Sequence, residues 1–275
     1  MGLRAQKFSG LGNEILIINL ITEEEKFSPS KIKQIQDTNQ VNFDQLLIIR
    51  PPSKPENDLW VDIYNRDGSE AENCVNGARC LANYLIRNDL VFKEEPKIET
   101  KGGIWKLGSH NNKEYSVKFD APEYKSKTKT PSDQDTQGFF QIDIEGKTLD
   151  LGIVSLGNPH AICFITDIKN QPLAIWGEKL QLSAFFPEGV NLGLAEVLSD
   201  KRILLRVFER GVGETKACGS GACAAVLIGH HLGLIEEKTE VVFSGGNLNI
   251  EYHKKDGFLL ARGEVEFIEE LSLET

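Results

Sequence analysis

The two halves of this 275-residue chain carry the same markers in the same order. Leu11–Asn13 recurs 145 residues later as Leu156–Asn158, and Cys74 recurs after 144 residues as Cys218. Three further pairs have shifts of 143 to 146 residues: Phe43–Leu46 with Gly189–Leu192, Leu59–Asn65 with Ile203–Glu209, and Gly102–Gly103 with Gly245–Gly246. A constant shift of about half the chain is typical of a duplicated domain and excludes a solenoid of short repeats. We therefore expect two halves with the same fold.

Each half also contains the same predicted elements. Short apolar or alternating runs predict three strands in each half. These strands are Glu14–Leu20, Gln45–Ile49 and Leu59–Tyr64, then Ala161–Ile165, Asn191–Leu194 and Ile203–Phe208. Helices are predicted at Asn76–Arg87 and Gly221–Leu232. The second helix is apolar nearly all round, which is typical of a buried helix, so we expect strands to wrap a central helix in each half.

Two polar segments are predicted to be exposed. Ala121–Gly138 contains two prolines and no apolar periodicity, which is typical of a linker or loop. It is the candidate boundary between the halves. Pro51–Asp58 is predicted to be a surface turn between two strands.

The composition narrows the class of protein. A formal net charge of -10 does not fit a nucleic-acid-binding surface. The longest apolar stretches, Ile15–Ile18 and Ala222–Ile228, are too short to span a bilayer. The basic start of the chain lacks the apolar region and cleavage site of a signal peptide. We therefore expect a cytoplasmic protein, whose five cysteines do not form a disulfide framework.

Cys74 and Cys218 each lie at a turn that opens a predicted helix. The first turn of a helix presents N–H groups and a partial positive charge. This environment lowers the pKa of a thiol and can also hold a carboxylate. Two such thiols facing one tetrahedral carbon could invert it, because one thiolate would remove a proton and the opposite thiol would deliver one. The pattern therefore indicates an enzyme that inverts the α-carbon of an amino acid.

Other interpretations of the cysteines are weaker. Cys80, Cys163 and Cys223 lie within apolar runs and are expected to be small buried residues. No Cys-x-x-Cys pair or histidine at ligand spacing indicates a metal site. The Gly219–Gly221 turn is only a weak match to a dinucleotide loop. A disulfide between Cys74 and Cys218 under oxidation would indicate damage or regulation.

The sequence resembles the diaminopimelate epimerase family over nearly its whole length. The matching segments are Phe8–Asn13, Asp44–Gln45, Asn65–Glu70, Cys74–Arg79, Gly157–His160, Asn191, Glu209–Thr215 and Ala217–Gly221. The resemblance implies an α+β fold of two pseudo-symmetric halves, each a mixed, mainly antiparallel β-sheet around a central helix. It places the first half at residues 1–120, completed by a strand at about 264–275, and the second half at 121–263. It also implies a homodimer that uses neither a metal nor another cofactor.

The resemblance also implies roles for individual residues. Cys74 and Cys218 would be the two acid/base groups, and His160 and Glu209 would orient the reacting amino group. The two ends of the substrate would be bound by Asn13, Gln45, Asn65, Asn158, Asn191, Glu209 and Arg210. The reacting carboxylate would be held by backbone N–H groups of Asn76, Gly219 and Ser220. The N–H of Val75 could also bind the substrate, although its side chain would crowd the anion pocket. From the residues alone, Asn158 could also start a turn, Arg210 could be a solvated charge and His160 could be structural.

Some residues depart from the family pattern. Valine replaces a glycine at Val75, asparagine replaces a glycine at Asn42 and an apolar residue at Asn73, and serine replaces a histidine at Ser9. These changes leave three hypotheses: an epimerase that acts on LL-diaminopimelate to form the meso isomer, a racemase for another amino acid, and an inactive paralogue that binds an amino acid. The two intact cysteines disfavour the last.

Overall fold

The computed structural model describes residues 2–91, 93–122 and 138–274, and the chain forms two compact units. Unit 1 contains Met1–Phe119 and Arg262–Thr275, and unit 2 contains Asp120–Ala261. Of the linker expected at Ala121–Gly138, residues 123–137 lie outside the described residues.

Unit 1 is built on one mixed sheet. In the order of their pairing, its strands are β17 (Glu266–Leu273), β1 (Leu3–Gly10), β2 (Asn13–Asn19), β3 (Gln45–Arg50), β4 (Leu59–Asn65), β5 (Lys97–Thr100), β6 (Gly103–Ser109) and β7 (Glu114–Asp120). The pairs β2–β3 and β4–β5 are parallel, and the others are antiparallel. The helices are α1 (Pro29–Asn39) and α2 (Val75–Arg87).

Unit 2 repeats this arrangement. Its paired strands follow the order β8 (Gly138–Ile144), β9 (Lys147–Ser155), β10 (Pro159–Phe164), β11 (Asn191–Ser199), β12 (Arg202–Glu209), β14 (Lys238–Phe243) and β15 (Gly246–His253). Its other elements are the 3-10 helix η1 (Ile168–Asn170), α3 (Leu173–Gln181), the short strand β13 (Gly213–Thr215), α4 (Gly219–His231) and β16 (Phe258–Glu264). The pairs β10–β11 and β12–β14 are parallel, at the same places in the order as β2–β3 and β4–β5. The repeat in the sequence is therefore also a repeat of topology.

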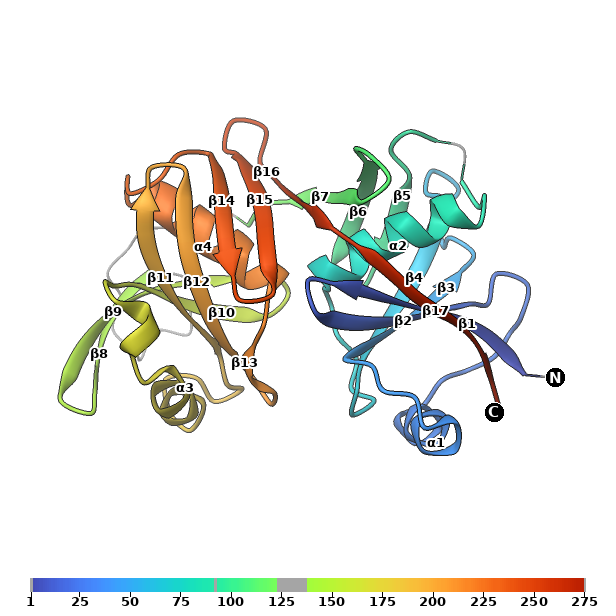
Figure 1. The fold of residues 1–275 in the computed structure, drawn as a ribbon, viewed down its shortest axis with the longest axis horizontal. Helices are drawn as coiled ribbons and strands as arrows, with labels where there is room; N and C mark the ends of the chain where they lie inside the picture. The colour runs from blue at the N-terminus through green and yellow to red at the C-terminus, as the bar shows by residue number, and fades with distance from the viewer. Residues whose placement is uncertain (1, 92, 123–137, 275) are drawn as a thin grey trace. The chain divides into compact units, whose positions relative to one another are not determined.

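Each sheet is covered by helices, and Figure 1 shows α2 and α4 beside strands of their own units. Ile32 and Ile35 of α1 pack in one core cluster with Leu46 and Ile48 of β3. Between these two residues, Leu47 contacts the start of α2. Because side chains alternate along a strand, β3 is buried by a different helix on each face. This explains why the strand is a continuous apolar run and does not alternate with polar residues.

The structure confirms the mixed α+β class, the six predicted strands and the two predicted helices, with bounds that differ by a few residues. The segment expected as a surface turn, Pro51–Asp58, forms turns and bends between β3 and β4. The polar segment between the first two predicted strands of each half is compatible with a helix, and the structure places α1 and α3 there. Ten of the thirteen residues of α2 and of α4 are buried, while the wrapping of strands around these helices stays a prediction.

Candidate active site

Cys74 is the N-cap residue of α2 and is buried. Its sulfur accepts a hydrogen bond from the backbone N–H of Gly77 at 3.0 Å. Its thiol also donates to Oε1 of Gln45, the first residue of β3. A donor from the helix and an acceptor from the strand therefore both meet this sulfur atom.

Gln45 continues into a series of hydrogen bonds along the end of the sheet. Its Nε2 donates to Oδ1 of Asn65 at 3.2 Å, and Nδ2 of Asn65 donates to Oγ of Ser69 at 3.1 Å. Ser69 Oγ in turn donates to Oδ1 of Asp67 at 2.6 Å. The structure thus brings three predicted site residues of unit 1 together, and it adds Ser69 and Asp67 to which no role was given from the sequence.

Asn13, Val75 and Asn76 have other surroundings. Asn13 Nδ2 donates to Asp44 at 3.3 Å, whereas its Oδ1 is buried and has no hydrogen-bond partner among the described residues. Val75 is the first residue of α2 and is buried. The side chain of Asn76 accepts a hydrogen bond from Arg79 at 2.7 Å, so only its backbone N–H suits the role expected for it.

Two of the departures from the family pattern have polar partners. The indole N–H of Trp105 donates to Oδ1 of Asn73 at 3.1 Å. Nη2 of Arg66 donates to Oδ1 of Asn42 at 3.0 Å. A polar residue is therefore accommodated beside Cys74 by a hydrogen bond from β6.

In unit 2, Cys218 is the N-cap residue of α4 and is buried. The pKa of its thiol is raised well above the usual value, chiefly by burial and then by the negative charge of Glu209. Hydrogen bonds with Ser220 and Gly221 act in the opposite direction. The expectation that the start of the helix would lower this pKa is therefore wrong for Cys218, because desolvation outweighs the helix terminus.

Ser220 connects Cys218 to a buried polar group. Its Oγ lies 3.6 Å from the sulfur of Cys218 and 3.0 Å from Nε2 of His160. Asn158 contacts both, with Nδ2 at 3.4 Å from Ser220 Oγ and Oδ1 at 3.1 Å from His160 Nε2. Burial lowers the pKa of His160 to about 3, so the imidazole is neutral at neutral pH.

Asn191, Glu209 and Arg210 form a neighbouring group. Asn191 Oδ1 accepts a hydrogen bond from the backbone N–H of Arg210 at 2.8 Å. Thr215 Oγ1 donates to Oε1 of Glu209 at 2.5 Å. The guanidinium of Arg210 is exposed and donates to the carbonyl of Glu188 at 2.8 Å.

The strand registers place these residues in two equivalent rows. Gln45 lies opposite Ile15 and Asn65 in unit 1. In unit 2, Asn191 lies opposite His160 on β10, and the register of β11 with β12 places it opposite Glu209. Each row ends on the strand, β4 or β12, after which the chain continues to a helix-capping cysteine.

All five cysteines are buried thiols, and none of them, Cys74 and Cys218 included, is part of a disulfide. Burial raises the pKa of Cys163 to about 11, as expected for a core residue. In the described part of the chain, no group of three His, Cys, Asp or Glu side chains could hold a metal ion. No helix within the described ranges is long and apolar enough to cross a membrane.

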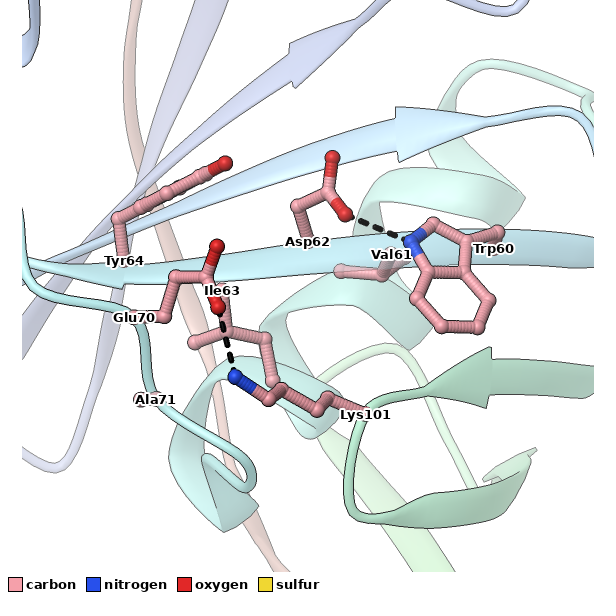
Figure 2. Close-up of a pocket in the computed structure, with 8 residues that line it drawn as sticks. All are labelled: Trp60, Val61, Asp62, Ile63, Tyr64, Glu70, Ala71 and Lys101. Carbon is pink, nitrogen blue, oxygen red and sulfur yellow. Dashed lines mark hydrogen bonds and ion pairs between the residues drawn. The ribbon is translucent and has the colours of Figure 1, made fainter. Parts of the chain in front are cut away.

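A pocket of about 130 Å³ lies on unit 1 (Figure 2). It is lined by Trp60, Val61, Asp62, Ile63, Tyr64, Glu70, Ala71 and Lys101. Its charged side chains are paired, since Lys101 contacts Glu70 at 2.7 Å and Trp60 donates to Asp62 at 2.6 Å. None of the residues that the sequence assigned to the site lines it.

The fold belongs to a class that includes amino-acid epimerases. A hydroxyproline epimerase from Agrobacterium vitis matches with a TM-score of 0.71 and 10% identity, over 98% of this chain and 92% of that chain. A phenazine biosynthesis protein of the PhzF family from Bacillus anthracis matches with a TM-score of 0.68 and 16% identity, over the full length of both chains. At such low identity these matches show the fold alone.

Comparison at the level of sequence is more specific. The family model for diaminopimelate epimerase matches residues 6–125 and 152–268. Diaminopimelate epimerases from Ectopseudomonas mendocina and Pseudomonas aeruginosa are 38% and 37% identical, each over 92% of both chains. The chain belongs to the diaminopimelate epimerase family.

Proposed function

We propose that this protein is an amino-acid epimerase that interconverts LL- and meso-diaminopimelate. Relatives that share 38% of its residues over 92% of its length carry that name. The observation that carries the chemistry is the pair of cysteines, each capping an equivalent helix in two units of the same topology. In this role the enzyme would serve lysine and peptidoglycan precursor synthesis.

The reaction needs only proton transfers. One cysteine, as a thiolate, takes the α-hydrogen as a proton and becomes a thiol. The other cysteine, as a thiol, gives its proton to the opposite face of the carbanion and becomes a thiolate. Charge and protons balance without a redox step, so we propose that the enzyme uses no cofactor.

The starts of α2 and α4 suit the carboxylate of the substrate. In α2 the first helical hydrogen bond runs from Ala78 N–H to the Cys74 carbonyl at 2.8 Å, and Ala222 and Cys218 repeat it in α4 at 2.9 Å. The N–H groups that precede these bonds point to the helix terminus, where the dipole favours an anion. We assign the carboxylate to backbone N–H groups of Val75, Asn76, Gly219 and Ser220. There they would also stabilise the negative charge of the carbanion.

Glu209 links substrate binding to the state of Cys218. Its carboxylate is the second largest cause that raises the pKa of the Cys218 thiol. A substrate ammonium group beside Glu209 would offset that negative charge and make the thiolate easier to form. His160 is neutral and can accept or donate one hydrogen bond without adding charge. We propose that both residues orient the reacting amino group.

The remaining residues would bind the rest of the substrate. The Oδ1 atom of Asn13 is a buried acceptor without a partner among the described residues, which suits an ammonium group. The exposed guanidinium of Arg210 suits the distal carboxylate. Gln45, Asn65, Asn158 and Asn191 would add amide contacts. We further propose a cytoplasmic homodimer.

Deuterium exchange tests the proposal. The purified protein is incubated under reducing conditions with LL-diaminopimelate in D2O, and α-deuterium and the meso isomer are followed by NMR. We expect both to appear, and Cys74→Ser and Cys218→Ser each to abolish the inversion. Incorporation of deuterium into a different amino acid, but not into diaminopimelate, would show that the enzyme is a racemase for that other amino acid. Val75 favours this alternative. Full activity in either cysteine variant would remove the two-base mechanism.

A further inference from the structure

A directed series of hydrogen bonds leads from an exposed turn to Cys74. It consists of Cys74 to Gln45, Gln45 to Asn65, Asn65 to Ser69, and Ser69 to Asp67. Every donor in the series points toward Asp67. Such chains are cooperative, because each bond polarises the next one.

The carboxylate at the end of the series sets its direction. Asp67 accepts from both the hydroxyl and the backbone N–H of Ser69, at 2.6 and 2.9 Å, and these bonds lower its pKa. As an ionised carboxylate it can only accept, so the Ser69 hydroxyl is used as a donor. Ser69 Oγ must then accept from Asn65, and Asn65 Oδ1 must accept from Gln45. Gln45 is left with its Oε1 toward the sulfur of Cys74.

The conformation of the turn that holds Ser69 is fixed by backbone hydrogen bonds and by a close approach to α1. The backbone N–H of Asn65 donates to the carbonyl of Ser69 at 2.8 Å, and Gly68 N–H donates to the carbonyl of Asn65 at 2.9 Å. Gly68 has a φ of +84°, and a Cβ there would lie 2.5 Å from Cα of Pro29 at the start of α1. The position of the Ser69 hydroxyl is therefore fixed by the backbone and by α1.

We propose that Ser69 and Asp67 are positioning residues that fix the side-chain amide of Gln45 so that its oxygen accepts a hydrogen bond from the Cys74 thiol and disfavours the thiolate. An amide oxygen can stabilise a thiol but repels a thiolate, whereas the amide N–H groups would do the reverse. This inference rests on the proposed function, in which Cys74 is one of the two acid/base groups. It makes Cys74 the proton donor once a bound ammonium group beside Glu209 has let Cys218 form the thiolate.

Among the residues that the structure describes, the equivalent row of unit 2 is arranged differently, because Glu209 itself is hydrogen-bonded to the Cys218 thiol. Glu209 takes the place of Asn65 and Asn191 the place of Gln45, and the Asn191 amide accepts from the backbone of Arg210. The other charged or titratable groups on α2 and on the strands that pack against it are Arg79, Cys80, Tyr84 and Arg87 on α2, Arg4 and Lys7 on β1, Glu14 on β2 and Lys106 on β6, with Lys7 paired to Glu14 at 2.8 Å. None of these is a member of the series, so a change at Ser69 leaves them in place.

The pH profile of alkylation tests the inference. Iodoacetamide reacts with thiolates, and trypsin places Cys74 alone in the peptide Asp67–Arg79, which mass spectrometry can quantify. In Ser69→Ala, the side chain of Asn65 loses its hydrogen-bond acceptor. The side-chain amide groups of Asn65 and Gln45 can then flip, exchanging their oxygen and nitrogen positions. We expect the midpoint of Cys74 alkylation to fall by about one pH unit, which is a roughly tenfold gain in rate below the midpoint.

Two variants and one internal reference separate this effect from a structural one. Ser69→Thr keeps the hydroxyl and should restore the native midpoint, while Asp67→Asn should give a smaller shift in the same direction. The alkylation of Cys218 in the same sample should not change. An unchanged Cys74 midpoint in Ser69→Ala, or a midpoint that Ser69→Thr does not restore, would overturn the inference. Alkylation does not depend on turnover, so a shifted midpoint in a protein without epimerase activity would reject the proposed function alone.

Discussion

His160 and Ile15 occupy the same position in the two units: His160 lies opposite Asn191 on the parallel neighbour strand, as Ile15 lies opposite Gln45. The next position in each row is Glu209 in unit 2 and Asn65 in unit 1. The duplicated scaffold therefore carries two titratable side chains, His160 and Glu209, in the row of unit 2 and none in the row of unit 1. This difference would let two equivalent cysteines take different protonation states.

The pH dependence of stability should report the buried imidazole. The pKa of His160 is lowered to about 3, compared with about 6.5 in an unfolded chain. Between these two pH values the unfolded chain binds one more proton than the folded chain. The contribution of the neutral His160 to stability is therefore fully present above about pH 6.5 and is lost as the pH falls. The slope from this group is about 1.4 kcal/mol per pH unit.

Urea unfolding of the wild type and His160→Gln between pH 4.5 and 7.5 measures this slope. Glutamine can keep a hydrogen bond at the position of Nε2 but does not titrate, so the free energy of unfolding should fall less steeply with acid. His110→Gln, at an exposed position, is the control and should keep the wild-type slope. Parallel curves for the wild type and His160→Gln would contradict a neutral buried His160.

Glu209→Gln should separate the two effects assigned to this carboxylate. Loss of its charge removes a cause that raises the pKa of the Cys218 thiol, so alkylation of Cys218 should begin at lower pH. Activity should fall by about 10-fold to 100-fold, because a hydrogen bond to the charged ammonium group is worth about 1.5 to 3 kcal/mol. Glu214→Gln, whose carboxylate pairs with Arg206 at 2.7 Å, is the control. Equal pH profiles of Cys218 alkylation in Glu209→Gln and Glu214→Gln would show that the charge of Glu209 does not govern the thiol.

The sequence could predict the scaffold because its strands and its two buried helices differ clearly in their apolar patterns. It indicated only a helix-compatible segment where α1 lies, because Ser28 as N-cap and Pro29 in the first turn are the only marks of a helix start in that polar sequence. The state of Cys218 could not be predicted either, because burial and the approach of Glu209 depend on packing. Likewise, Asp67–Ser69 lies within a segment that matches the family pattern, but its link to Gln45 depends on the register of β3 with β4.

Glu99 should anchor the loop between β3 and β4. Its buried carboxylate accepts from the Ser53 hydroxyl and from the N–H groups of Ser53 and Lys54, at 3.1 and 2.9 Å. Asn57 Nδ2 adds a bond at 2.7 Å. The Ser53 hydroxyl is the largest cause that lowers the pKa of Glu99, to about 2. The stability that it contributes is therefore present above about pH 4.3, the unfolded value, and is lost as the pH falls toward 2.

The Tm of Glu99→Gln should accordingly be lower than that of the wild type at pH 7, with a gap that narrows from pH 5 to pH 3. An amide cannot accept all four hydrogen bonds, and it does not titrate. Glu95→Gln, at an exposed position two residues before β5, should follow the wild type throughout. A gap that stays constant with pH would show that the loss comes from packing instead of the charge.

Gly77→Ala should damage catalysis more than stability. A Cβ at Gly77 would lie 2.8 Å from the sulfur of Cys74 and 3.0 Å from Leu47 Cδ1. The sulfur can rotate away from the new Cβ, which limits the cost in stability. That cost is also partly offset by the gain of about 1 kcal/mol for alanine over glycine inside a helix. The displaced sulfur would lose its alignment with the α-carbon, and a displacement of about 1 Å can cost about 100-fold in rate.

Gly221→Ala is the matched change in unit 2, where the nearest atoms, Val207 Cγ2 and Cys218 Sγ, lie at 3.1 and 3.3 Å. We expect a smaller loss of kcat there, measured by deuterium incorporation, with both variants close to the wild type in urea unfolding. Equal losses of activity would show that the approach of Cβ to sulfur does not govern the reaction.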